Sequence, residues 1–303
     1  MPHSLDRRQF ITRAAGIAGA ASIIATAPRV LLADGINPAA GKAIAAIKPA
    51  RLFEVGTVTY NLGKAMDVDT LIATCEKGGF KAVELRSTHA HGVEPDISKE
   101  QRKAVRDRFT KTKVKLFDLG SACEYHSEKA DVVKQNIELS RKFIELAADV
   151  GAVGVKVRPN GLPKSVPVEA TLKQIGHALQ EVGKHAEKHK VEIHVEVHGT
   201  GTSHPPHMKT IMDVCAHPAV GVTWNSNDTD VKDGSIAEYF RMLAPHIMNV
   251  HMRDLYVNYP FVELFTLLKS INYNRYTLAE IPESSDPLRV MQYYRKTWEL
   301  LSA

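Results

Sequence analysis

Short apolar runs with β-strand character alternate with stretches of helical periodicity from residue 53 to the C-terminus. The predicted strands are 53–60, 81–86, 114–120, 152–158, 191–198, 219–225, 247–252 and 276–281. Between them, the apolar residues of 171–187 recur at intervals of three and four, as expected of an amphipathic helix. They are Leu172, Ile175, Leu179, Val182 and Ala186.

Eight strand–helix repeats predict an α/β fold, a (β/α)8 TIM barrel over residues 51–303. A doubly wound sheet is the alternative architecture. Such a sheet would carry a glycine-rich phosphate loop after its first strand, but the sequence there is Thr59-Tyr60-Asn61-Leu62-Gly63.

The N-terminal segment differs from the rest of the chain. Arg7 and Arg8 precede an uncharged Ala/Gly-rich stretch, 14–27, which is too short and too weakly apolar for a spanning helix. The pattern predicts a twin-arginine signal peptide over residues 1–33, with 34–50 as a linker or N-terminal arm. We therefore expect a periplasmic or otherwise exported protein, with the twin-arginine machinery as a partner and no stable membrane insertion.

Charge and cysteine content narrow the range of partners. The formal net charge is +5, and residues 1–33 carry four arginines and one aspartate, so the mature chain has about +5 − 3 = +2. This small charge gives no support for nucleic-acid binding. The cysteines Cys75, Cys123 and Cys215 form no close pair and predict no disulfide framework; Cys75 and Cys215 are expected in helices, as core residues.

Potential metal ligands occur once per repeat in the C-terminal half. Glu196, Asn225, His251 and Glu280 lie at or near the ends of successive predicted strands, at intervals of 29, 26 and 29 residues. One strand–helix unit has about this length, so the four side chains are expected to converge at one end of the barrel. Buried donors of this kind are costly unless they bind a cation, which predicts a divalent metal site. Asp228 is the alternative donor to Asn225.

Strand alternation places further polar groups near this centre. In 191–198, His194, Glu196 and His198 share one face and the β-branched residues share the other. We expect His194 to be a core histidine and His198 to contact substrate. Lys156 and Arg158 are predicted to hold substrate oxygens, or alternatively to form an ion pair with Glu84 or Glu196. The other candidate substrate contacts are Arg253, Glu84 and His91.

Six segments together resemble, in their order and spacing, the sugar phosphate isomerase/epimerase family. They are AVELR (82–86), VKVRPNG (155–161), VEVHG (195–199), VTWNSND (222–228), VHMRD (250–254) and AEIP (279–282). That family belongs to the xylose-isomerase-like TIM-barrel superfamily. The resemblance implies a divalent metal held by Glu, Asp, His and Glu of strands five to eight. Glu196, His251 and Glu280 match this set in type, and Asn225 stands where the family usually has Asp.

The expected cofactor is Mn²⁺ or Mg²⁺, with Zn²⁺ and Co²⁺ as alternatives. The expected function is proton transfer on a small carbohydrate, through an enediolate, with Glu196 and Glu280 as base and acid. β-Elimination from keto-glycosides is an alternative outcome, and a non-catalytic exported carbohydrate-binding protein is another. A phosphodiesterase would need a richer zinc cluster. The sequence leaves open whether the protein is an oligomer.

Overall fold

The computed structural model describes residues 51–303, and the predicted signal peptide (1–33) and linker (34–50) lie outside the described residues. Within 51–303 there are eight strands. Their bounds are β1 Glu54–Val58, β2 Ala82–Arg86, β3 Lys115–Glu124, β4 Gly154–Arg158, β5 Glu192–Glu196, β6 Val220–Asn225, β7 Ile247–Met252 and β8 Tyr276–Ala279. Each corresponds to one predicted run.

All neighbouring strands pair in parallel, and β1 pairs with β8, which closes the sheet into a barrel. The predicted TIM barrel is confirmed, and the doubly wound sheet is excluded because such a sheet has open edges. Four predicted strand ends were wrong. β1 ends at Val58 and β8 at Ala279, each two residues before its predicted end. β3 runs on to Glu124, where it still pairs with Arg158 of β4. β5 stops at Glu196 rather than at residue 198, because its ladder with β6 ends at Thr223.

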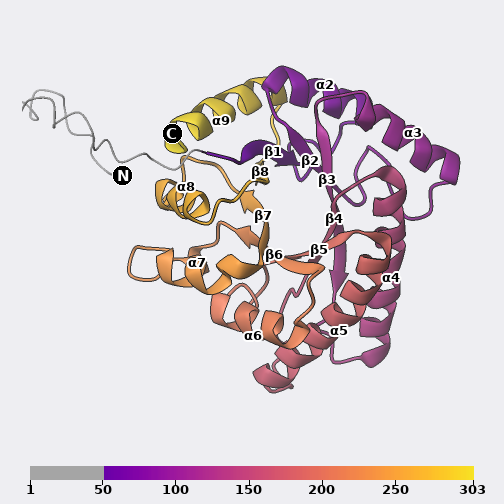
Figure 1. Ribbon diagram of the computed structural model, residues 1–303, viewed down its shortest axis with the longest axis vertical. Coiled ribbons are helices and arrows are strands. Elements are labelled where there is room, and N and C mark those ends of the chain that lie inside the picture. Colours follow the sequence, from indigo (N-terminus) through magenta and orange to yellow (C-terminus); the bar gives the residue numbers. More distant parts are fainter. Residues whose placement is uncertain (1–50) are drawn as a thin grey trace, which may run out of the picture. The chain divides into compact units, whose positions relative to one another are not determined.

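Helices in chain order surround the strands, as Figure 1 shows in a view down onto the ring. Their bounds are α2 Val68–Gly78, α3 Lys99–Thr110, α4 Ala130–Val150, α5 Val168–His189, α6 Pro205–Cys215, α7 Ala237–Leu243, α8 Phe261–Ser270 and α9 Pro287–Leu301. Local signals start several of them: Asp67 accepts from the Thr70 amide at the start of α2, and Ser98 and Gln101 form a capping box before α3. The predicted helix 171–187 lies inside α5.

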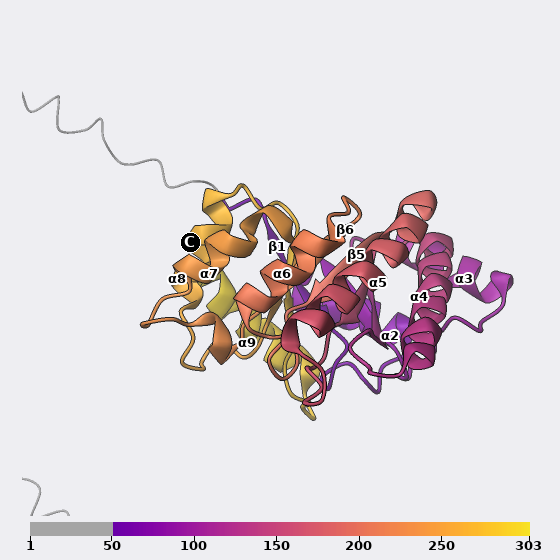
Figure 2. The same cartoon turned by 90° about the horizontal axis from the view of Figure 1, so that it is seen from below.

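The apolar face of each strand packs outward against the helices. Val195 of β5, for example, is fully buried in the same cluster as Leu179 and Val182 of α5. The inside of the barrel is different, with a small apolar group of Val58, Ala82, Phe117 and Leu278. Polar side chains fill the rest of the interior and continue to the carboxyl ends of the strands, where βα loops form a site (Figure 2 turns the same ribbon by 90°).

All three cysteines are free and buried, with Cys75 in α2 and Cys215 in α6 as predicted. Across residues 51–303, no helix combines the length and apolar character needed to cross a membrane.

Candidate active site

A cavity of about 330 Å³ opens at the carboxyl ends of the strands. Seven of the predicted site residues line it: Lys156, Arg158, Glu196, His198, Asn225, Arg253 and Glu280. This grouping follows from the parallel barrel, since every strand delivers its last residues to the same face. Arg86 also lines the cavity, as do Tyr60, Ser226 and Asn227, which were not predicted as site residues. Tyr60 could have been found by the same reasoning, because it follows the first strand.

Glu196, His251 and Glu280 come together beneath this cavity. Each offers one donor atom, and these atoms lie within 4.8 Å of one another. His251 is completely buried, and its Nδ1 lies 3.8 Å from Glu280 Oε2 with no hydrogen-bond partner. A buried ring nitrogen without a partner, facing two carboxylates, is the arrangement that a cation would complete. The donor set therefore fits a divalent metal.

Glu84 orients the histidine of this cluster. Its Oε2 accepts from His251 Nε2 at 2.8 Å, and both side chains are fully buried. A carboxylate holding one ring nitrogen leaves the other free to act as a ligand. The sequence predicted Glu84 as a substrate contact, but the structure places it below the cavity, against His251.

Lys156 is the main partner of Glu196. Its ammonium lies 2.8 Å from Glu196 Oε2, with both side chains 4% exposed, and the Asn225 amide lies 3.2 Å from Glu196 Oε1. The predicted alternative of an ion pair to Glu196 is therefore present. Burial alone would raise the pKa of Glu196, but the nearby Lys156 and His251 cations outweigh it and hold that pKa at about 2.

Opposite charges face one another in this centre, with one more carboxylate than cation. Burial would lower the pKa of His251, but Glu84 and its hydrogen bond raise it to about 9. Burial also raises the pKa of Glu280, although His251 opposes this. Two cations, Lys156 and protonated His251, thus face the three carboxylates of Glu84, Glu196 and Glu280. A metal would take the place of the proton on His251 Nδ1, since only the unprotonated nitrogen can coordinate.

A hydrogen-bonded chain holds the rim of the cavity. Glu124 Oε1 accepts from Arg158 at 2.6 Å and from Asn160 at 2.5 Å, and Asn160 Oδ1 accepts from His198 Nδ1 at 2.8 Å. Gly199 allows its own loop and the loop of Asn160 to approach closely. Its φ is +92°, and a Cβ there would lie 2.5 Å from the Asn160 backbone. Arg158 is therefore paired to Glu124, not to Glu84 or Glu196.

Other predicted residues lie away from the cluster. Asp228, the alternative to Asn225, is 88% exposed and ion-paired to Arg253. His91 does not line the cavity; its Nε2 donates to the Arg86 carbonyl and its Nδ1 accepts from the Val93 amide, so both nitrogens hold the loop.

His194 is the core histidine that the sequence predicted. Its Nδ1 donates to Asp118 at 2.6 Å and its Nε2 to Glu192 at 2.9 Å, with the ring fully buried. Glu192 also accepts from Arg275 Nη2 at 2.9 Å. This network lies deeper in the barrel than the cavity. It binds β3, β5 and the segment before β8 together and takes no part in lining the site.

Comparisons with known proteins agree with this architecture. The sequence profile of the xylose isomerase-like TIM barrel family matches residues 72–300, and the chain belongs to that family. No curated protein sequence matched.

Solved structures with the same fold include three of particular interest. A 3-keto-D-glucoside 4-epimerase from E. coli is 13% identical, with a TM-score of 0.68 over 82% of this chain and 98% of that one. An L-ribulose 3-epimerase is 14% identical, with a TM-score of 0.70 over 82% and 94%. The zinc-bound IolI protein is 16% identical, with a TM-score of 0.66 over 82% and 96%. At such identities the likeness establishes the fold alone.

Proposed function

We propose that this chain catalyses divalent-metal-dependent proton transfer on a sugar or keto-sugar. The observation that carries the proposal is the convergence of Glu196, His251 and Glu280, with the His251 Nδ1 buried and without a hydrogen-bond partner. The epimerases among the structural neighbours support sugar chemistry of this kind. A bound cation would supply Lewis-acid polarisation of a substrate carbonyl, which acidifies the adjacent C–H bond.

The protein groups have separate tasks in this scheme. Glu196 and Glu280 both line the cavity, one at the end of β5 and one just beyond β8, so two carboxylates can reach a substrate carbon from different strands. One removes the proton and the other returns it. Lys156 keeps Glu196 ionised and hydrogen-bonded, while Arg158 and His198 are held at the rim to orient hydroxyl groups. β-Elimination from a keto-glycoside begins with the same proton removal.

Deuterium exchange tests the proposal directly. The purified chain is incubated with ketoses and keto-glycosides in D₂O with Mn²⁺, and the carbon next to the carbonyl is followed by NMR. We expect deuterium incorporation, lost in Glu280→Gln. Glu283→Gln is the matched control, because Glu283 is 68% exposed and pairs with Lys64, away from the metal cluster. Absence of exchange on every substrate would overturn the proposal.

A second candidate, a non-catalytic carbohydrate-binding protein, is favoured by one observation. Both oxygens of Glu196 already have partners, Lys156 and Asn225, and Asn225 brings a neutral amide instead of a carboxylate. If this candidate is right, Glu196→Gln and Glu280→Gln leave sugar binding nearly intact in calorimetry, and no turnover is found with any substrate.

We also infer that the protein is exported. The paired arginines Arg7 and Arg8 before an uncharged Ala/Gly-rich stretch support this. Cell fractionation of the parent and an Arg7→Lys/Arg8→Lys variant tests it. Export of the variant at the parent level would contradict the twin-arginine route.

A further inference from the structure

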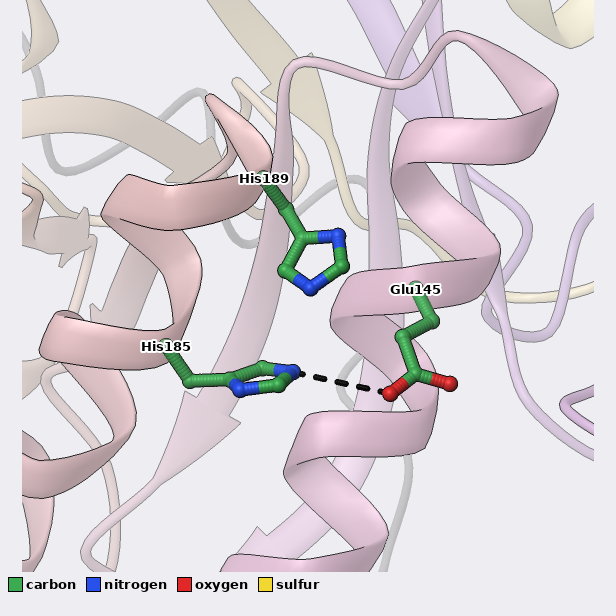
Figure 3. A group of neighbouring side chains, drawn as sticks. All are labelled: Glu145, His185 and His189. Atoms are coloured by element: carbon green, nitrogen blue, oxygen red, sulfur yellow. Dashed lines mark ion pairs between the residues drawn. The ribbon is translucent and has the colours of Figure 1, made fainter.

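A second group of metal-ligating side chains lies on the outer ring of helices. His185 and His189 stand one turn apart near the end of α5, and Glu145 faces them from α4 (Figure 3). Residues four apart on a helix project from the same face, so both imidazoles point toward the neighbouring helix. Figures 1 and 2 both show α4 and α5 side by side.

The three side chains are close enough to share one ion. One donor atom of each lies within 4.8 Å of the others, and the two imidazole rings have centroids 4.7 Å apart. His185 Nε2 lies 3.6 Å from Glu145 Oε1, too far for a hydrogen bond, and is a buried nitrogen with no hydrogen-bond partner. Ligands on a tetrahedral zinc lie about 3.3 Å apart, given bonds of roughly 2.0–2.1 Å, so small side-chain rotations suffice.

We propose that Glu145, His185 and His189 form a second, structural metal site, which takes Zn²⁺ or a transition-metal ion of similar ligand preference. Two imidazoles and one carboxylate suit Zn²⁺, Ni²⁺ and Cu²⁺ and disfavour Mg²⁺ and Ca²⁺, which prefer oxygen-only sites. The site differs in this respect from the centre beneath the cavity, which has two carboxylates and one imidazole.

The charges around the site permit binding. Burial and the neighbouring His189 lower the pKa of His185, which favours the neutral, coordinating form of the ring. Lys188 and Arg141 are the nearby cations. Arg141 is already neutralised, because its guanidinium pairs with Glu138 and with Glu181 of α5.

The location of the site gives its role. His189 lies three residues before the start of β5, so the site lies toward the amino ends of the strands, whereas the catalytic cavity opens at their carboxyl ends. The five residues of β5 alone span roughly 16 Å at about 3.3 Å per residue. An ion here cannot reach the substrate. It would instead join the last turn of α5 to α4 and stabilise the folded state.

Zinc titration of the untagged full-length chain tests the proposal. Calorimetry measures the number of Zn²⁺ ions bound per chain, in the parent and in the double variant His185→Gln/His189→Gln. We expect the double variant to bind one equivalent fewer. Zn²⁺ should also raise the Tm more in the parent than in the double variant. With free Zn²⁺ at roughly 100 times the Kd of this site, we expect the two shifts in Tm to differ by on the order of 5 °C.

The matched control is His177→Gln, because His177 is an exposed histidine on the same helix, outside the cluster. It should keep the full number of Zn²⁺ ions. Glu145→Gln leaves α5 intact and should weaken Zn²⁺ binding at this site about tenfold. This variant replaces the double variant in the titration if the double variant does not fold. An unchanged number of ions in the double variant, or an equal loss in His177→Gln, would overturn the proposal. Deuterium exchange at the catalytic centre should be unaffected by these variants, so the two proposals can fail separately.

Discussion

Replacing Lys156 with Met tests the charge balance of the catalytic centre. The ammonium and Glu196 Oε2 are 2.8 Å apart and almost completely buried. At an effective dielectric constant of about 20, their attraction is about 6 kcal/mol before desolvation is considered. Because the substitution leaves Glu196 buried and unpaired, we expect a net loss of about 3–5 kcal/mol. That corresponds to a fall in Tm of roughly 10 °C.

The substitution should also change the response to metal. Without Lys156, a divalent cation becomes the main counter-charge for Glu196, so Mn²⁺ should bind more tightly and recover much of the lost stability. The assay is thermal denaturation of the parent and the variant, each with EDTA and with a Mn²⁺ series. We expect the Mn²⁺-induced rise in Tm to be several degrees larger in Lys156→Met.

Lys173→Met provides the comparison. Lys173 and Glu169 are 2.7 Å apart, but their side chains are 54% and 73% exposed. Removing this solvated pair should cost about 0–1 kcal/mol and leave the metal response unchanged. The reasoning is refuted if Lys156→Met melts within about 2 °C of the parent in EDTA. It is also refuted if Mn²⁺ stabilises both proteins equally.

Three further predictions concern separate parts of the barrel. Asn225→Asp adds a carboxylate to the metal cluster and should tighten Mn²⁺ binding about tenfold in calorimetry, worth about 1.4 kcal/mol; unchanged affinity would exclude position 225 as a ligand. The pKa of Glu192 is about 2 in the folded protein against an ordinary 4.5. The ionised Glu192 therefore stabilises the folded protein fully above pH 4.5, and this contribution is lost as the pH falls toward 2. The shift in pKa is worth about 3 kcal/mol of unfolding free energy at most, and about 1–2 kcal/mol after allowing for the partial exposure of Glu192. Between pH 5 and 3, the free energy of unfolding from urea titrations should fall less in Arg275→Met than in the parent. The same dependence of this free energy on pH in both proteins would contradict the prediction. Gly199→Ala forces a Cβ against the Asn160 backbone at φ +92°, so it should destabilise the protein by about 1–3 kcal/mol in thermal melts and raise the KM for sugar.

The barrel could be predicted from the sequence because its signal is local. Each strand is a short apolar run, and the helix between residues 171 and 187 has its apolar residues on one face. The last residues of parallel strands must meet at one face, which is why Glu196, Asn225 and Glu280 were found together. Strand ends were less predictable, since pairing with a neighbour decides them, as for β3 and β5.

The sequence offered the ion pair of Lys156 with Glu196 as an alternative, but it did not indicate the partners of other site residues. Glu84 looked like a substrate contact by its position at the end of a strand, yet it lies against His251, 167 residues later. His91 stood in a loop near the site, but its own backbone contacts occupy both nitrogens. Asn160 lies at the rim because Gly199 lets its loop come close, and Glu124 lies there because β3 runs on beside Arg158 of β4.

The sequence by itself determined the periodicity, the parallel barrel and the face on which polar groups gather, because each depends on residues close together in the chain or on a rule common to all parallel barrels. The tertiary structure decided which of those groups are neighbours. Register and side-chain packing place the Lys156 ammonium on Glu196, Glu84 on one nitrogen of His251, and the free Nδ1 toward Glu280. Two helices packed side by side likewise bring Glu145 of α4 to His185 and His189 of α5.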